Sequence, residues 1–210
     1  MVTLLVLLAS CGSSAAQSVD SRGTSSSATF VVAAACGPAG ATTLAADGRA
    51  RIYVVNQIVY GCSASGHRSF RLGRANRVFA QARVGPAAVA GDVAAYGLAN
   101  FGVDTVTASV VVRRLTDGAQ LEALPATRAH GAESFESVGS VVVRPDGTGA
   151  WIGSLHSIIG HRSATEVHEA NSAGDRVLDS GLGIDSTSLR LRGDTLSWVN
   201  GGVTRHATLH

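Results

Sequence analysis

The stretch Val143-Arg144-Pro145-Asp146-Gly147-Thr148-Gly149-Ala150-Trp151-Ile152 decides the expected fold of this 210-residue chain. Two apolar segments flank a Pro-Asp-Gly turn, and the second segment carries a tryptophan. Asp-Gly between apolar runs is a strong hairpin signal, because glycine adopts the positive φ that a tight turn requires. We therefore predict two antiparallel β-strands joined at this turn.

The same hairpin pattern occurs four times along the chain. The other three copies have Asp-Gly or Gly-Asp turns at 47–48, 91–92 and 193–194. Each second strand carries one aromatic anchor, and the four anchors are Tyr53, Tyr96, Trp151 and Trp198. The anchors are 43, 55 and 47 residues apart, and a period of about 40–50 residues is typical of a four-stranded propeller blade. We expect these anchors to be core residues that pack one repeat unit against the next, rather than a platform for sugar rings.

Further strand-like segments follow each hairpin. They are 57–62, 68–72, 108–115, 119–124, 166–170 and 176–178. The last copy keeps only 203–209 after its hairpin, so we expect Thr29 to Ala35 to supply its missing outer strand. Because no segment has a capped helical pattern, we predict an all-β fold of repeated antiparallel hairpins or blades. We expect these units to form a small or partial β-propeller, and the alternative is a β-sandwich.

A family resemblance supports the repeat interpretation. Residues 143–152 resemble the Pro-Asp-Gly repeat of TolB-type and related WD40-like β-propellers, although the other three copies lack the proline. Residues 58–62 and 188–198 are also similar to segments of exported proteins of high-GC bacteria. The resemblance covers about residues 30–210 and implies a propeller-like fold in an exported protein. It implies no particular activity, because one fold serves many functions.

The N-terminus has the pattern of an export signal. The apolar run Val2 to Leu8 is too short to span a hydrocarbon core of ~30 Å and fits a signal-peptide h-region. Residues 8–11, Leu-Ala-Ser-Cys, resemble a bacterial lipobox, which implies that Cys11 is lipidated, although no Arg or Lys precedes the apolar run. We predict a signal peptide over 1–11 and an envelope protein that contacts the membrane only through this lipid. The alternative is cleavage after Ala16 and full secretion.

The rest of the chain divides into a tether and a domain. Residues 12–28 are rich in Ser, Ala and Gly, which predicts a flexible tether ahead of a domain at 29–210. Processing removes or consumes Cys11, so Cys36 and Cys62 remain as a pair that an oxidising compartment would join in a disulfide.

Composition excludes several classes of protein. Apolar residues make up 45% of the chain and charged residues 15%, which excludes a disordered chain. All 17 basic residues are arginine, so the absence of lysine excludes a Walker-type phosphate loop and a Schiff-base enzyme. The net charge of +2 is too small to predict a nucleic-acid partner.

One group of residues offers metal-binding chemistry. The candidate ligands are His156, His161, Glu166 and His168, and the last two share a face if they lie on a strand. Their spacing matches no established metal motif, and scattered surface histidines are the favoured interpretation. We predict no catalytic residue, because no Gly-x-Ser-x-Gly elbow occurs, and no cofactor.

These features favour a non-catalytic binding or scaffold module for an envelope protein or a wall polymer. The basis is an anchor, a tether, a repeat scaffold and the lack of a catalytic motif. Three longer connections are the candidate binding loops, Gly97 to Thr105, Pro125 to Val138 and Gly153 to Ala164. The alternative is a metal-dependent hydrolase or lyase that uses the histidine cluster.

Overall fold

The computed structural model describes residues 36–129, 131 and 133–210, which all belong to the unit Val32–His210. Every regular element among the described residues is a β-strand, which confirms the predicted all-β class. No helix in this part of the chain is long and apolar enough to cross a membrane. The predicted signal peptide (1–11), Cys11, the tether (12–28) and the strand expected at 29–35 lie outside the described residues.

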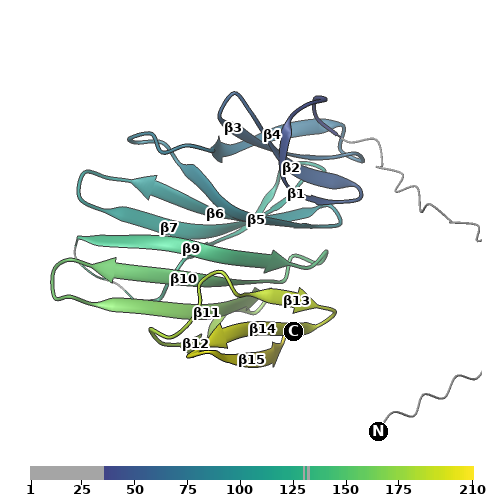
Figure 1. Ribbon diagram of the computed structural model, residues 1–210. Helices are drawn as coiled ribbons and strands as arrows, with labels where there is room; N and C mark the ends of the chain where they lie inside the picture. The colour runs from purple at the N-terminus through teal and green to yellow at the C-terminus, as the bar shows by residue number, and fades with distance from the viewer. Residues whose placement is uncertain (1–35, 130, 132) are drawn as a thin grey trace, which may run out of the picture. The chain divides into compact units, whose positions relative to one another are not determined.

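The described strands form four consecutive antiparallel units (Figure 1). Unit 1 contains β1 (Thr42–Asp47), β2 (Ala50–Val55), β3 (Ile58–Ser63) and β4 (Arg68–Arg74). Unit 2 contains β5 (Arg83–Ala90), β6 (Val93–Phe101), β7 (Val106–Arg114) and β8 (Gln120–Pro125). Unit 3 contains β9 (Ser134–Val143), β10 (Gly149–Ser157), β11 (Ser163–Asn171) and β12 (Gly174–Ser180). Unit 4 contains β13 (Arg190–Arg192), β14 (Thr195–Asn200) and β15 (Val203–Thr208).

All four predicted hairpins are confirmed, as β1–β2, β5–β6, β9–β10 and β13–β14. Each turn contains a glycine with positive φ: Gly48 (42°), Gly91 (57°), Gly147 (95°) and Gly193 (57°). This is the conformation that the Asp-Gly and Gly-Asp signals predicted, since glycine has no Cβ to clash there. The further strands predicted from the sequence are β3, β4, β7, β8, β11 and β12.

Units 1 to 3 belong to one 12-stranded sheet by hydrogen bonding. Within each unit the strands pair antiparallel in chain order, and β8 pairs only with β7. Single parallel bridges join the units, Arg74 to Arg83 between β4 and β5 and Val106 to Phe135 between β7 and β9. Unit 4 is a separate three-stranded sheet, β13-β14-β15.

Apolar clusters lie between successive units. The first joins units 1 and 2, the second joins units 2 and 3, and the third joins units 3 and 4. On β6, Ala94 and Tyr96 face unit 1 while Val93 and Ala95 face unit 3, because side chains alternate along a strand. On β10, Trp151 likewise faces unit 2, and its two neighbours face unit 4. The units therefore stack face to face, and the central strands are apolar on both faces.

The aromatic anchors occupy the second strand of each unit and are almost fully buried, as predicted. Tyr96, Trp151 and Trp198 each belong to the cluster shared with the preceding unit. Tyr53 differs, because it points away from Ile52 and unit 2, and the expectation that it packs between units is wrong. The described N-terminal residues cover it instead: a Cβ at Gly37 would lie 2.7 Å from the Tyr53 ring.

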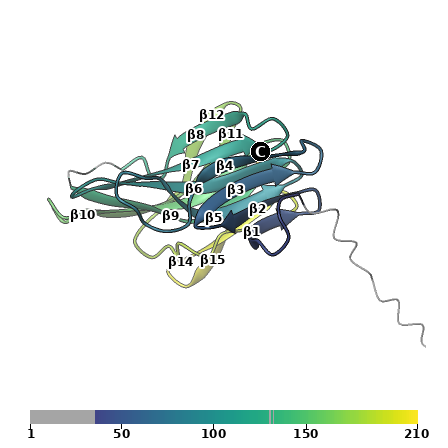
Figure 2. The same cartoon turned by 90° about the horizontal axis from the view of Figure 1, so that it is seen from above.

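The antiparallel order gives the stack two distinct ends. The turn end carries the four predicted hairpins, where Asp47 Oδ2 accepts a hydrogen bond from Gly91 N (2.6 Å) and Arg144 Nη1 lies 2.9 Å from Asp194 Oδ1. The connection end carries the β2–β3, β6–β7, β10–β11 and β14–β15 turns and the links between units. From above (Figure 2), the fourth strands β8 and β12 lie on the same side of the stack.

The three candidate loops are shorter than predicted. The residues between strands are 102–105, 126–133 and 158–162. The strands extend further because Phe135 on β9 pairs with His156 on β10, and Phe101 on β6 pairs with Val106 on β7. All three loops lie at the connection end.

Candidate functional site

A buried polar network lies in the interior of unit 3, nearer the turn end than the connection end. Trp151 on β10 and His168 on β11 are cross-strand partners. Their rings stack with centroids 4.8 Å apart and planes 6° from parallel. Both side chains are excluded from solvent, so the imidazole relies on protein groups for its hydrogen bonds.

Two carboxylates flank the imidazole of His168. Its Nε2 is 2.8 Å from Glu166 Oε2, and its Nδ1 is 3.6 Å from Asp175 Oδ2, beyond hydrogen-bonding distance. Burial lowers the pKa of His168 below its ordinary value, against the opposing effect of the two carboxylates. The neutral ring therefore donates Nε2–H to Glu166 and leaves Nδ1 without a hydrogen bond.

Residues 126–129, which we call the strap, are fixed to this network on their way from β8 to β9. Trp151 Nε1 donates to Ala126 O (2.9 Å), and Arg128 N donates to Glu166 Oε2 (2.7 Å). The Arg128 guanidinium lies 3.2 Å from Asp175 Oδ2 and holds the pKa of that carboxyl below its usual value. A Cβ at Gly153 would overlap the Ala126 carbonyl, so glycine permits this close approach.

The network is suited to positioning the strap rather than to catalysis. His168 has no exposed surface, and a catalytic base must come within hydrogen-bonding distance of its substrate. Each of its neighbours is hydrogen-bonded to the strap or to another strand. The network therefore fixes the strap against unit 3.

The structure does not bring the four candidate metal ligands together. Glu166 and His168 are in contact, as their shared strand face predicted, but His156 pairs with Ser163 five residues along β11. Five strand residues span about 17 Å, whereas ligands of one zinc ion lie ~2–2.2 Å from it. Among the described residues, no group of three or more His, Cys, Asp or Glu side chains is arranged to hold a metal ion.

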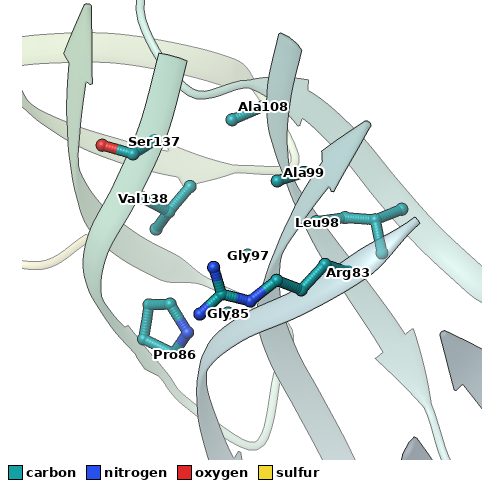
Figure 3. A pocket seen from close by; sticks show the side chains of 9 residues that line it. All are labelled: Arg83, Gly85, Pro86, Gly97, Leu98, Ala99, Ala108, Ser137 and Val138. Atoms are coloured by element: carbon teal, nitrogen blue, oxygen red, sulfur yellow. The ribbon is translucent and has the colours of Figure 1, made fainter. Parts of the chain in front are cut away.

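A small cavity lies between units 2 and 3, with lining residues from β5, β6, β7 and β9 (Figure 3). It forms where Gly85 and Gly97 lack side chains, and a Cβ at Gly97 would lie 2.8 Å from Val138 Cβ. Its volume is about 110 Å³, well below the ~300–1,000 Å³ of ligand pockets. We therefore do not assign a substrate to it.

Exposed apolar side chains gather at the connection end. Of the nine exposed large hydrophobic side chains among the described residues, seven lie there: Phe79, Val103, Phe135, Ile158, Ile159, Leu182 and Val203. Val103 and Leu182 are the most exposed, at 82% and 74%. The other two, Leu44 and Leu121, lie on β1 and β8.

Pairwise contacts connect several neighbouring loops of this end. The Arg77 guanidinium lies 4.7 Å from the Phe101 ring centroid, which links the β4–β5 and β6–β7 connections. Phe135 is paired with both neighbouring strands, and Ile158 N donates to Glu133 O (3.2 Å). Between the strap and the β10–β11 loop is a hollow of about 440 Å³. Its lining residues are Ala129, Leu155, His161, Arg162, Ser163, Ala164 and Leu182.

The fold and this surface define an all-β protein of stacked antiparallel units with an apolar connection end. Comparisons with protein-family models and with curated proteins found no match. The resemblance to TolB-type propellers and the lipobox therefore remain predictions. The three loops could be predicted from the sequence, whereas the apolar character that they share could not, because the exposed residues are far apart in the chain.

Proposed function

We propose that this chain is a non-catalytic binding module that holds a partner protein at its connection end. The observation that carries the proposal is the gathering of seven exposed large hydrophobic side chains on the loops of that end. Isolated exposed apolar residues are ordinary, but a group of them on one surface marks an interaction site.

The composition of this surface fits a protein partner. The loops combine exposed apolar side chains with exposed polar ones, among them Glu133, His161 and Arg162, and protein interfaces contain both. The hollow beside Leu182 is large enough to receive one apolar or aromatic side chain, the kind of anchor that dominates binding energy. The strap forms one wall, so the buried network keeps this hollow in shape.

We propose an envelope location for this activity and a propeller-like relationship between the units. The lipobox-like residues 8–11 and the polar stretch 12–28 support a lipid anchor and a tether. The face-to-face stacking of units 1 to 4, with one buried aromatic anchor on the second strand of each, supports successive blades. A β-sandwich remains the alternative for the arrangement as a whole.

Site-specific photo-crosslinking in native envelopes tests the partner proposal. A photoreactive amino acid placed at Val103 or Ile159 of the full chain should form one discrete adduct with a single protein. The same probe at Leu44 or Leu121, which are exposed elsewhere, should form none. Leu182→Asp should abolish the adduct and Leu121→Asp should preserve it. Equal adducts from all four positions, or an adduct that survives Leu182→Asp, would contradict the proposal.

A further inference from the structure

Charge is distributed very unevenly along this chain. Residues 36–90 contain seven arginines and one carboxylate, a net charge of +6, whereas residues 91–210 contain nine arginines and thirteen carboxylates, a net charge of −4. The overall charge of +2 is the sum of these two opposite net charges. Unit 1 and the link that follows it are therefore strongly basic.

Strand alternation places several of these arginines on the face of unit 1 that points away from unit 2. Ile52 and Val59 contribute to the cluster between units 1 and 2. Their neighbours Arg51 and Tyr60 lie on the opposite face, and Tyr60 pairs with Arg71 on β4. This surface, which we call the outer face of unit 1, has no apolar cluster among the described residues.

Tyr53 contacts three other residues on this face. Its ring contacts the Arg51 guanidinium, which lies 4.8 Å from the ring centroid, and the ring of Tyr60, with centroids 5.6 Å apart. Arg51 Nη2 also donates to Pro38 O (2.9 Å). Tyr53 is itself buried and offers no open ring face to solvent, and its hydroxyl donates to Ser69 Oγ (2.9 Å).

A hollow of about 260 Å³ opens beside Ser69 and the Cys36–Cys62 disulfide. Its lining residues are Cys36, Gly37, Ser63, Ala64, His67, Arg68 and Ser69. Arg68, His67 and Ser69 are exposed and supply hydrogen-bond donors. The hollow thus combines hydroxyl and cationic groups at the edge of the outer face.

The arginines of unit 1 form no ion pair within the described residues. The arginines that do so are Arg114, Arg128, Arg144 and Arg176, all in units 2 and 3 or their connections. Arg68 and Arg71 are exposed, and their guanidinium groups have no carboxylate partner there. Their planar donor sets match carboxylate and phosphate groups.

We propose that the outer face of unit 1 and the adjoining hollow bind an acidic polysaccharide, with Arg71 on the face and Arg68 in the lining of the hollow pairing its carboxylate or phosphate groups and the hollow receiving a sugar ring. Single-stranded nucleic acid fits less well, because it requires open aromatic faces for base stacking and Tyr53 has none. A protein partner fits the apolar connection end instead. The proposal does not depend on that docking function, since the two surfaces share no residue.

Affinity measurements with the full chain test this inference. The probes are polygalacturonate and phosphorylated dextran, with neutral dextran and a 20-nucleotide oligothymidine as comparisons. We expect binding to at least one acidic polysaccharide, weakened by added salt, and none to neutral dextran. Arg68→Gln with Arg71→Gln should weaken it by about tenfold or more. Arg192→Gln with Arg205→Gln, which removes the same charge from β13 and β15, should leave it within about twofold.

Each alternative result overturns the proposal. It fails if neither acidic polymer binds, if neutral dextran binds equally well, or if oligothymidine binds more tightly. It also fails if the Arg68/Arg71 variant binds like the parent protein. Both double variants should keep the thermal midpoint of the parent, because these arginines are exposed and have no ion pair in the described residues, so loss of binding is not loss of folding.

Discussion

Trp151 and His168 stack with ring centroids 4.8 Å apart, on neighbouring strands in the interior of unit 3. The indole N–H of the tryptophan also donates to Ala126 O in the strap. The histidine is hydrogen-bonded to the Glu166 carboxylate, which also accepts a hydrogen bond from Arg128 N. One aromatic pair thus couples the core between units 2 and 3 to the wall of the apolar hollow. Its perturbation should affect both stability and the connection end.

Stability should fall as the pH drops below neutrality, because His168 is neutral in the folded protein. Burial lowers its folded pKa, so between its unfolded pKa of about 6.5 and its lower folded pKa the unfolded chain binds more protons. The free energy of unfolding should therefore decrease as the pH falls below about 6.5. Urea unfolding at pH 7.5, 6.5 and 5.5 measures this slope.

His168→Gln should flatten that slope, whereas His206→Gln, at an exposed position on β15, should not. Histidine chemical shifts of the parent protein provide a second measurement that does not need a folded variant. If the least accessible histidine titrates at or above pH 6.5, His168 is not held neutral.

A second loss of stability is expected at lower pH. The pKa of Asp175 is depressed in the folded protein, so protonation of this carboxyl in acid removes its pairing with Arg128 and destabilises the fold.

Trp151→Ala should be among the most destabilising substitutions in the chain. It removes a large buried side chain from the second cluster, and such truncations typically cost ~3–5 kcal/mol. Trp151→Phe keeps most of the packing and loses the bond to Ala126 O, which should cost less, about 1–3 kcal/mol. Urea unfolding of both variants gives the comparison, and equal losses would show that the strap contact, not the packing, dominates.

Gly153→Ala should destabilise the protein although it adds a single methyl group. The new Cβ would overlap the Ala126 carbonyl, which is backbone and cannot rotate away, and overpacking of this kind costs ~1–3 kcal/mol. Gly85→Ala on β5 is the matched control, since its nearest neighbour would be 3.7 Å away. A thermal midpoint for Gly153→Ala that equals the midpoint of Gly85→Ala would mean that the strap shifts freely.

The repeated hairpins could be predicted from the sequence because their signals are local. A glycine beside an aspartate fixes each turn, and the aromatic that follows falls on a buried position in all four units. The disulfide was also predictable, as the parity of the cysteines leaves Cys36 and Cys62 as the pair. These two cysteines lie at disulfide-bonding distance.

The sites were less predictable because they depend on contacts between distant residues. The strap reaches Glu166 from 38 positions away, and no local pattern marks Arg128 as its partner. Glu166 and His168 were correctly placed on one strand face, but only packing shows that this face is buried under Trp151. The basic character of unit 1 could not be predicted from the net charge, because the positive charge of unit 1 and the negative charge of the later units largely cancel.

Loss of the Cys36–Cys62 bond should cost about 3 kcal/mol of stability. The two cysteines are 26 positions apart in the sequence, and a cross-link that closes a loop of this length lowers the conformational entropy of the unfolded chain by an amount worth about 3 kcal/mol. The bond also holds Gly37 and Pro38 against Tyr53 and Arg51. Urea unfolding with and without a reductant should show the loss in the parent protein, whereas Cys36→Ser with Cys62→Ser should be insensitive to the reductant. If reductant leaves the oxidised parent unchanged while free-thiol titration confirms reduction, other contacts hold the segment in place and the disulfide contributes little.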